Sequence, residues 1–352
     1  MKPSSDARPG TANSGKRTTI YDIAHSVGTS PSAVSAVLNG TWRKRRISQK
    51  LADRISAVAI EQGYSVNLQA SVLRRDRSNI IGMVIPKYDN RYFGAIAEQF
   101  EEGARQRGYF PVITCTQRDP ELEFEAARML LSYQVECLVV TGATDPDRIS
   151  DLCHSAGVKV INLDLPGTKA PSVISDNFQG ALDLTRLLLR DWGNEDGRSE
   201  SLYFVGGRTN DHNTSERIRG FLQAHAEKGL NVPQTNILAC GYAAQKAHTS
   251  LAALERLPEG IFVNSTISLE GVVMWLSELP PERQQRIQYC CFDWDPFAAL
   301  MPNCVGMAQQ DVPALLDHVF NLIKTDLDST EIKQIACNLR GQRPSQHAGV
   351  AS

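Results

Sequence analysis

A small all-α unit followed by a two-lobed α/β body, built from two doubly wound parallel sheets, is the fold class that the sequence predicts. The chain has 352 residues, which is too long for one ordinary domain. Three short stretches with helical periodicity lie before residue 64, and from residue 80 short apolar stretches alternate with helical patterns. This alternation continues for about 260 residues, more than a single sheet usually takes, and therefore predicts two lobes.

Composition limits the kinds of protein that this chain can be. Hydrophobic residues make up 42% and charged residues 22%, as in ordinary globular proteins, and no apolar run is long enough to cross a membrane. The polar stretch 1–17 lacks the apolar core of a signal peptide, so we expect a cytoplasmic protein. Eight scattered cysteines without a C-x-x-C pair indicate structural thiols rather than a disulfide framework or a metal site, and no cofactor is expected.

The charge is distributed unevenly along the chain. Residues 1–78 contain thirteen Lys or Arg and five Asp or Glu, a net charge of +8, whereas the whole chain has a net charge of −2. The remainder therefore carries −10. A basic end on an acidic body predicts a polyanionic partner for that end, although charge alone leaves a solvated basic tail open.

The first 18 residues read as a disordered basic tail, and three helices are expected after it. Each begins at a residue that favours the N-cap position, namely Thr19, Ser30 and Ser48. Asp22 completes a capping box with Thr19, and Pro31 occupies the first helical position after Ser30. The expected helix ends are glycines that tolerate a left-handed backbone: Gly28, Gly40 and Gly63.

The first two of these helices form a candidate helix-turn-helix in a domain spanning residues 19–64. They are joined at Gly28-Thr29, and the second helix, residues 31–38, is the candidate recognition helix. Its amino-terminal residues would meet base edges in the major groove, and its first amide groups would meet phosphate. Since many small helical bundles look alike, this pattern alone is weak.

Longer motifs resemble the headpiece of the lactose and galactose repressor (LacI/GalR) family. They are TIYDIA at 19–24, VGTSPSAVS at 27–35, VLNG at 37–40 and GY at 63–64, and looser similarity continues to about residue 342. The resemblance implies a transcriptional regulator, most often a repressor, that binds a near-palindromic DNA operator as a homodimer. It also implies control by a small polar effector, a sugar or sugar derivative. An enzyme is not expected, because the chain has no P-loop, no G-x-S-x-G and no dinucleotide fingerprint.

The resemblance also implies which headpiece residues contact DNA. Contacts to the backbone would come from Tyr21, Ser30, Ser35 and Asn39. Residues over the bases would be Pro31, Ser32 and Ala33. The set is completed by Thr19 and Ala36.

Two features depart from the family pattern. Ala36 stands where the family usually has Arg, so it could offer only an apolar contact, for instance to a thymine methyl group. The loop at 41–46 is about three residues longer than usual, and its Arg43, Arg45 and Arg46 could bind phosphate or enter the minor groove. A merely solvated run of charge is the alternative for this loop.

Residues 65–79 match the family's hinge helix and linker. In the family this helix folds only on operator DNA, where two copies pack in the minor groove. The resemblance implies that Asn67, Ala70 and Leu73 contact DNA, with Leu73 as a wedge between base pairs. Ordinary hydrophobic packing is the alternative for Leu73.

The body, residues 80–343, resembles the periplasmic sugar-binding-protein fold. The first apolar strand is expected at 80–85 and is followed by a helix at 93–108. The other expected strands are 109–115, 137–141, 158–163, 172–175, 201–205, 236–240, 260–264 and 287–292. Ligands in such folds bind at the carboxyl ends of the strands, here facing a cleft between two lobes.

Motif positions suggest the effector contacts, which combine aromatic faces with carboxylate, amide and guanidinium groups suited to sugar hydroxyls. They are Asp89, Arg91, Phe93, Thr141, Asp164, Arg217, Tyr242, Ser265, Asp293, Trp294 and Gln310. Arg91 replaces a small residue or proline of the family, and Asn264-Ser265-Thr266 stands where relatives often carry Asn-Asp.

Several alternatives stay open at this point. A transport-type sugar-binding protein would need a signal peptide and no headpiece. A regulator whose body only dimerises, or an activator in place of a repressor, would carry much the same motifs. Residues 344–352 read as a flexible tail in place of the leucine-heptad helix of tetrameric relatives, so we expect a dimer and no membrane partner.

Overall fold

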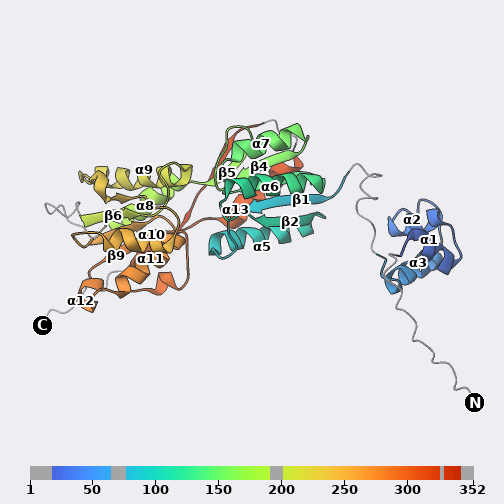
Figure 1. Cartoon of the computed structure of the whole chain (residues 1–352), viewed down its shortest axis with the longest axis horizontal. Helices are drawn as coiled ribbons and strands as arrows, with labels where there is room; N and C mark the ends of the chain where they lie inside the picture. The colour runs from blue at the N-terminus through green and yellow to red at the C-terminus, as the bar shows by residue number, and fades with distance from the viewer. Residues whose placement is uncertain (1–17, 65–76, 191–200, 326–328, 342–352) are drawn as a thin grey trace, which may run out of the picture. The chain divides into compact units, whose positions relative to one another are not determined.

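The computed structural model describes residues 18–64, 77–190, 201–325 and 329–341 (Figure 1). The chain forms two compact units, residues 1–78 and 79–352, which are described separately. The tail at 1–17, the predicted DNA contacts Asn67, Ala70 and Leu73 of the hinge helix, and the end of the chain at 344–352 lie outside the described residues. In the described part, no helix is both long and apolar enough to span a membrane.

The first unit is a bundle of three helices, here called the headpiece. They are α1 (Ile20–Val27), α2 (Pro31–Leu38) and α3 (Gln49–Glu61). Ile23 of α1 and Ile55 of α3 are completely buried against each other's helices and α2, in the centre of a small apolar core. The three helices predicted for this unit are therefore confirmed.

Short polar side chains begin each headpiece helix, as the sequence predicts. The Thr19 hydroxyl accepts a hydrogen bond from the Asp22 amide while the Asp22 carboxylate accepts one from the Thr19 amide, which is a complete capping box. Ser30 and Ser48 cap α2 and α3 with one hydrogen bond each, which their hydroxyls accept from the amides of Ala33 and Leu51. Gly28 ends α1 with φ of 71°, a left-handed conformation that lets the chain turn into α2.

Lobe 1 of the body comprises residues 79–175 and 312–335. Its six parallel strands follow the order β11-β5-β4-β3-β1-β2. The strands are β1 (Ile80–Ile85), β2 (Phe110–Cys115), β3 (Cys137–Thr141), β4 (Lys159–Leu163), β5 (Ser172–Ser175) and β11 (Ile332–Ile335). One core lies under α5 (Arg91–Gln106) and α13 (Val312–Lys324), and a second lies under α6 (Pro120–Ser132) and α7 (Pro146–Ser155).

Lobe 2 comprises residues 177–309 and 338–341 and repeats this architecture (Figure 1). Its order is β12-β10-β9-β8-β6-β7, parallel except for β12. The strands are β6 (Leu202–Val205), β7 (Ile237–Leu238), β8 (Gly260–Val263), β9 (Gln288–Phe292), β10 (Cys304–Gln309) and β12 (Asn338–Gly341). The helices are α8 (Asn177–Leu188), α9 (His212–Glu227), α10 (Ala244–Ala252), α11 (Thr266–Ser277) and the short α12 (Pro281–Gln284).

The chain passes between the lobes three times, after β5, after β10 and after β11. At the first two passages the buried Ser175 hydroxyl donates a hydrogen bond of 2.6 Å to the Gln310 side-chain oxygen. The two doubly wound sheets confirm the predicted fold class, but β10, β11 and β12 are not among the predicted strands. All eight cysteines are free thiols, and Cys290 and Cys291 are buried in β9, as expected.

Candidate functional site

The amino-terminal end of α2 presents a polar surface in the headpiece. Tyr21 is 69% exposed, and Ser30 and Ser32 are also exposed, with their hydroxyl oxygens 3.0 Å apart. At the other end of α2, the Asn39 amide donates to the Ser35 carbonyl (2.7 Å) and hydroxyl (3.1 Å). All of these polar side chains belong to α1, α2 or the caps of α2. The N-caps of the two helices and the turn at Gly28 orient them.

Ala36 does not belong to this surface, contrary to the sequence-based prediction. It is only 4% exposed, and its carbonyl accepts hydrogen bonds from the Thr41 amide (2.9 Å) and hydroxyl (3.3 Å). The chain that leaves α2 therefore folds back over Ala36. Its methyl group packs inside the headpiece and cannot contact a base in this conformation.

The loop after α2 is an ordered turn that carries four exposed cations: Arg43, Lys44, Arg45 and Arg46. Trp42 and Ile47 pack on the headpiece core at its two ends, and the Ile47 amide donates to the Trp42 carbonyl (3.1 Å). The guanidinium of Arg43 lies 5.1 Å from the centre of the Trp42 ring. Anchored in this way, the loop presents concentrated positive charge to solvent.

A cavity of about 300 Å³, including its opening, lies between the two lobes of the body. Its wall contains seven of the predicted effector contacts: Phe93, Asp164, Arg217, Tyr242, Ser265, Asp293 and Gln310. Five further wall residues were not predicted: Asn90, Tyr92, Arg118, Asn213 and Ile267. The wall is therefore polar, and most of it comes from the ends of strands and the first turns of helices.

Asp164 and Asp293 supply one carboxylate from each lobe. They follow β4 and β9 directly, and both have a left-handed backbone, with φ of 74° and 72°. Asp164 accepts hydrogen bonds from the Tyr92 hydroxyl and the Asn213 amide, both 3.2 Å, and Asp293 accepts one from the Gln310 amide. Burial raises the pKa of Asp164 to about 6 and also raises the pKa of Asp293, while the nearby Arg217 opposes both shifts.

Arg217 is the buried cation of the cavity, with 3% exposure. Its Nε donates to the Asn177 side chain (2.8 Å), and one Nη donates to the Asn264 carbonyl (2.6 Å). Its guanidinium also lies 3.7 Å from the centre of the Phe292 ring. Arg217 lies on α9, and these contacts with residues outside α9 fix the position of its guanidinium before any ligand enters.

Arg118 is a second cation in the wall, and sequence reasoning missed it. Its guanidinium lies 4.6 Å from the centre of the Tyr242 ring and 5.5 Å from that of Phe93. Gln117 and Arg118 both have positive φ, 55° and 58°, which is uncommon for two consecutive non-glycine residues. The only sequence signal was their position in the polar loop after β2, at the carboxyl end of a strand.

Four predicted effector contacts are not in the wall, and those predictions are corrected. Asp89 is exposed and pairs with Lys87, and Arg91 is exposed and pairs with Asp295. Thr141 is buried behind the wall, and Trp294 packs against the core of lobe 2.

Asn90 explains why Asp89 and Arg91 are not in the cavity wall. Its side-chain oxygen caps α5 by accepting hydrogen bonds from the amides of Tyr92 (3.1 Å) and Phe93 (3.2 Å). This cap buries Asn90 in the wall, while its two neighbours in sequence, Asp89 and Arg91, are exposed.

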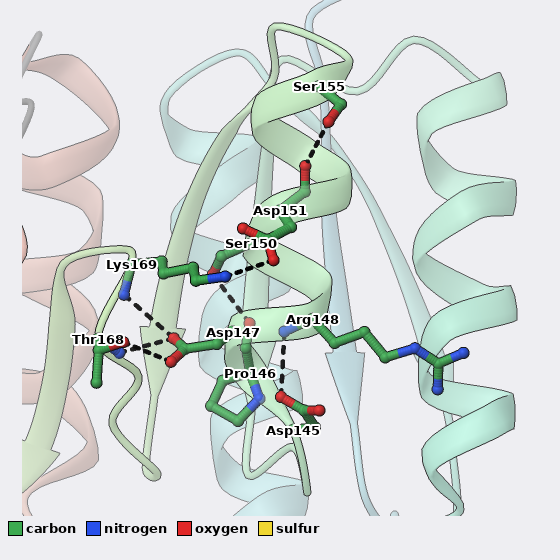
Figure 2. A network of polar contacts seen from close by, with 9 residues as sticks. All are labelled: Asp145, Pro146, Asp147, Arg148, Ser150, Asp151, Ser155, Thr168 and Lys169. Atoms are coloured by element: carbon green, nitrogen blue, oxygen red, sulfur yellow. Dashed lines mark hydrogen bonds and ion pairs between the residues drawn. The ribbon is translucent and has the colours of Figure 1, made fainter.

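The loop that follows Asp164 is fixed to α7. Figure 2 shows the Asp147 carboxylate facing Thr168 and Lys169, where it accepts hydrogen bonds from both amides (2.7 and 3.1 Å) and from the Thr168 hydroxyl (2.6 Å). Lys169 also forms an ion pair with Asp151. These contacts join the loop after β4 to the first turns of α7.

Comparisons with known proteins divide the chain in the same way as the structure. Residues 19–67 match the family model described as bacterial regulatory proteins, lacI family. Residues 78–278 match the model described as periplasmic binding proteins and sugar binding domain of the LacI family.

Among named relatives, the ribitol operon repressor of Klebsiella aerogenes is 59% identical over 193 residues, which is 55% of this chain and 72% of the relative. The sucrose operon repressor of Klebsiella pneumoniae is 26% identical over 318 residues, 89% of this chain and 93% of the relative.

Two solved structures share the fold. The lac repressor dimer bound to operator and the anti-inducer ONPF has a TM-score of 0.74 at 18% identity, covering 92% of this chain and 98% of that one. The Cra regulator of Pseudomonas putida in complex with fructose 1-phosphate has a TM-score of 0.66 at 20% identity, covering 76% of this chain and 100% of that one.

Proposed function

The chain belongs to the LacI family of bacterial regulatory proteins, and from this premise we propose that it is a repressor released from its operator by a small uncharged polyol of the ribitol class. Two headpieces of a homodimer bind the halves of a near-palindromic operator, and the cavity of the body binds the effector. As a family member the chain is a DNA-binding transcriptional regulator. It acts on the DNA of the nucleoid in the cytoplasm, and no catalytic step is assigned to it.

The cavity is the observation that carries the effector class. Carboxylates accept hydrogen bonds from hydroxyl groups, amides both donate and accept, and Phe93 and Tyr242 offer aromatic faces to C–H groups. Two buried carboxylates balance two guanidinium groups in this wall. A phosphate group would add negative charge beside Asp164 and Asp293 in a site of low dielectric, which favours an uncharged ligand.

The identity of the relative supports ribitol as the first compound to test. The ribitol operon repressor of Klebsiella aerogenes is 59% identical to this chain over 193 residues, which is far above the identity of the sucrose relative. A five-carbon polyol presents five hydroxyl groups along a short chain. The wall offers carboxylate, amide and guanidinium groups from both lobes to such a ligand.

On the DNA side, the exposed residues of α1 and α2 support the predicted contacts. Tyr21, Ser30 and Ser32 are free to face a duplex, and the α2 amino terminus with its Ser30 cap suits a phosphate. Residue 36 is an alanine without a guanidinium group and is also buried, so it contacts no base, and the basic loop at 43–46 is proposed to supply phosphate contacts. The hinge contacts of Asn67, Ala70 and Leu73 remain proposals.

One experiment separates the parts of this proposal. The purified protein would be used to select binding sequences from random duplex DNA, and the affinity for the selected site would be measured with ribitol, with ribitol 5-phosphate and without either. We expect a near-palindromic site, weaker binding with ribitol and no effect of the phosphate ester. The absence of any enriched sequence would contradict the DNA-binding proposal. An enriched site that ignores ribitol, or responds to the ester, would contradict the effector class.

A further inference from the structure

Two polar contacts cross from lobe 1 to lobe 2 beside the cavity. The Arg91 Nε donates to an Asp295 carboxylate oxygen at 3.0 Å, and the Asn90 side-chain amide donates to the Thr266 hydroxyl at 3.1 Å. Asn90 and Arg91 begin α5 in lobe 1, Thr266 begins α11, and Asp295 follows β9 in lobe 2. The two contacts therefore join adjacent residues of one lobe to two separate elements of the other.

Two of these side chains are fixed within their own lobe before they reach across. The Asn90 oxygen caps α5, which leaves its amide nitrogen for Thr266. One oxygen of Asp295 accepts from the Phe297 amide (2.9 Å) and the Ala298 amide (3.0 Å), which leaves the other for Arg91. Side chains that are already ordered lose little conformational entropy when they pair, so Asn90 and Asp295 add little to the entropy cost that usually offsets an exposed polar contact.

Arg91 and Asp295 lie outside the cavity wall, with side chains 50% and 25% exposed. The pair is therefore placed to act on the lobes without touching a ligand.

We propose that the Arg91–Asp295 and Asn90–Thr266 contacts form a latch that stabilises the closed arrangement of the two lobes, and that Arg91, Asp295 and Thr266 are positioning residues for effector binding. This inference rests on the proposed function in assigning the cavity to an effector. A ligand that contacts both lobes binds only the closed arrangement, so its apparent affinity falls in proportion to the closed fraction. Weakening the latch lowers that fraction and hence the affinity.

The test uses the full-length protein and ribitol as the probe. Arg91→Met keeps an unbranched apolar side chain and removes the charge, and Thr266→Val replaces the hydroxyl by a methyl group of similar size. We expect each substitution to weaken ribitol binding about twofold to fivefold by calorimetry. Arg91→Met combined with Asp295→Asn should weaken binding no more than the larger single effect, because both changes remove one contact.

A matched control is present on the same helix. Arg105 pairs with Glu101 at 2.9 Å, nearly the same distance as the latch pair, but both residues belong to α5. Arg105→Met should leave ribitol affinity at the value of the unmodified protein. An equal loss in this control would show that any charge removed from α5 has the same effect, and the latch would be rejected.

A second measurement needs no ligand and so separates failure of the latch from failure of the proposed effector. Hydrogen–deuterium exchange of the unliganded protein should accelerate in residues 90–93 and 265–268 of the Arg91→Met and Thr266→Val variants, relative to Arg105→Met. Exchange in α7 should not change. If ribitol does not bind the unmodified protein, the effector class is wrong and the exchange result still decides the latch. Unchanged exchange in these segments would overturn the latch, whatever happens to the affinity.

Discussion

The headpiece and the cavity use polar residues in opposite ways. In the headpiece, hydrogen bonds of the candidate contact residues reach two to five positions along the chain, and Tyr21, Ser30 and Ser32 are exposed. In the cavity, Asp164 bonds to residues 72 and 49 positions away, and Arg217 bonds to residues 40 and 47 positions away, all buried. The DNA surface is thus a local product of two helices, whereas the cavity exists only when both lobes are complete.

Removal of residues 1–78 gives the largest expected effect and tests whether the two regions are independent. Specific operator binding should disappear, because every proposed DNA contact lies in the deleted part. The remaining chain contains both lobes and should bind ribitol as the full protein does, measured by calorimetry. A body that is unfolded by circular dichroism would contradict the division into two units.

Arg217→Met should have the next largest effect, and only on the cavity. The change removes both hydrogen bonds of the buried Arg217 guanidinium and one of the two guanidinium groups that lower the pKa values of Asp164 and Asp293. A loss of about 3 kcal/mol, or more than a hundredfold in ribitol affinity, is expected, while operator binding persists without release.

Arg219→Met is the matched control, two positions along α9. Arg219 is 60% exposed and pairs with Glu216 on the same helix. Ribitol response should be retained in this variant. Full response in Arg217→Met as well would remove Arg217 from the proposed site.

The pH dependence of stability should differ between wild type and Asp164→Asn. Because burial raises the pKa of Asp164 to about 6, the folded body binds a proton more tightly than the unfolded chain does. Tighter proton binding stabilises the folded body at low pH. The free energy of unfolding should therefore fall by about 2–3 kcal/mol as the pH rises from about 4 to about 6. Urea denaturation at several pH values should show this fall in wild type and a smaller one in Asp164→Asn.

Asp89→Asn is the control variant, because it removes an exposed carboxylate from lobe 1 in place of the buried carboxylate of Asp164. Its carboxylate is 78% exposed and lies outside the cavity wall, so the variant should follow the wild-type profile. Parallel curves for wild type and Asp164→Asn would contradict the link between burial of Asp164 and stability.

Neutralising the basic loop gives the smallest expected effect and concerns only the headpiece. Replacing Arg43, Lys44, Arg45 and Arg46 by Gln should weaken operator binding and make it less dependent on salt. The slope of log affinity against log salt should fall by about 0.9 for each phosphate contact that is lost. Arg54→Gln, an exposed cation on α3, is the control for loss of a single charge. An unchanged slope in the loop variant would mean that these cations are only solvated.

Sequence alone predicts the headpiece well because its determinants are local. Thr19, Ser30 and Ser48 cap helices through residues three positions away, so the caps and helix bounds can be derived from short motifs. Ala36 was misjudged for the opposite reason. It is buried, and the longer loop after it returns Thr41 to its carbonyl, an arrangement that no motif describes.

The cavity was only partly predictable. Asp164 and Asp293 could be found because each directly follows an apolar strand, and parallel strands end on one edge of a sheet. Asn213 and Arg118 lie on a helix and in a loop, and only the packing of the lobes brings them to the same wall. The strands β11 and β12 were missed because each has four residues, nearly all exposed, without a continuous apolar run.

The late position of β11 and β12 has a consequence for synthesis. Each forms an edge of one sheet, so lobe 1 is complete only when residue 335 has left the ribosome and lobe 2 only when residue 341 has, whereas the headpiece is complete at residue 64. At translation rates of about 5–20 residues per second, the interval is roughly 14 to 55 seconds. We therefore expect a nascent molecule to carry a folded DNA-binding unit while its sensing unit is still unfinished.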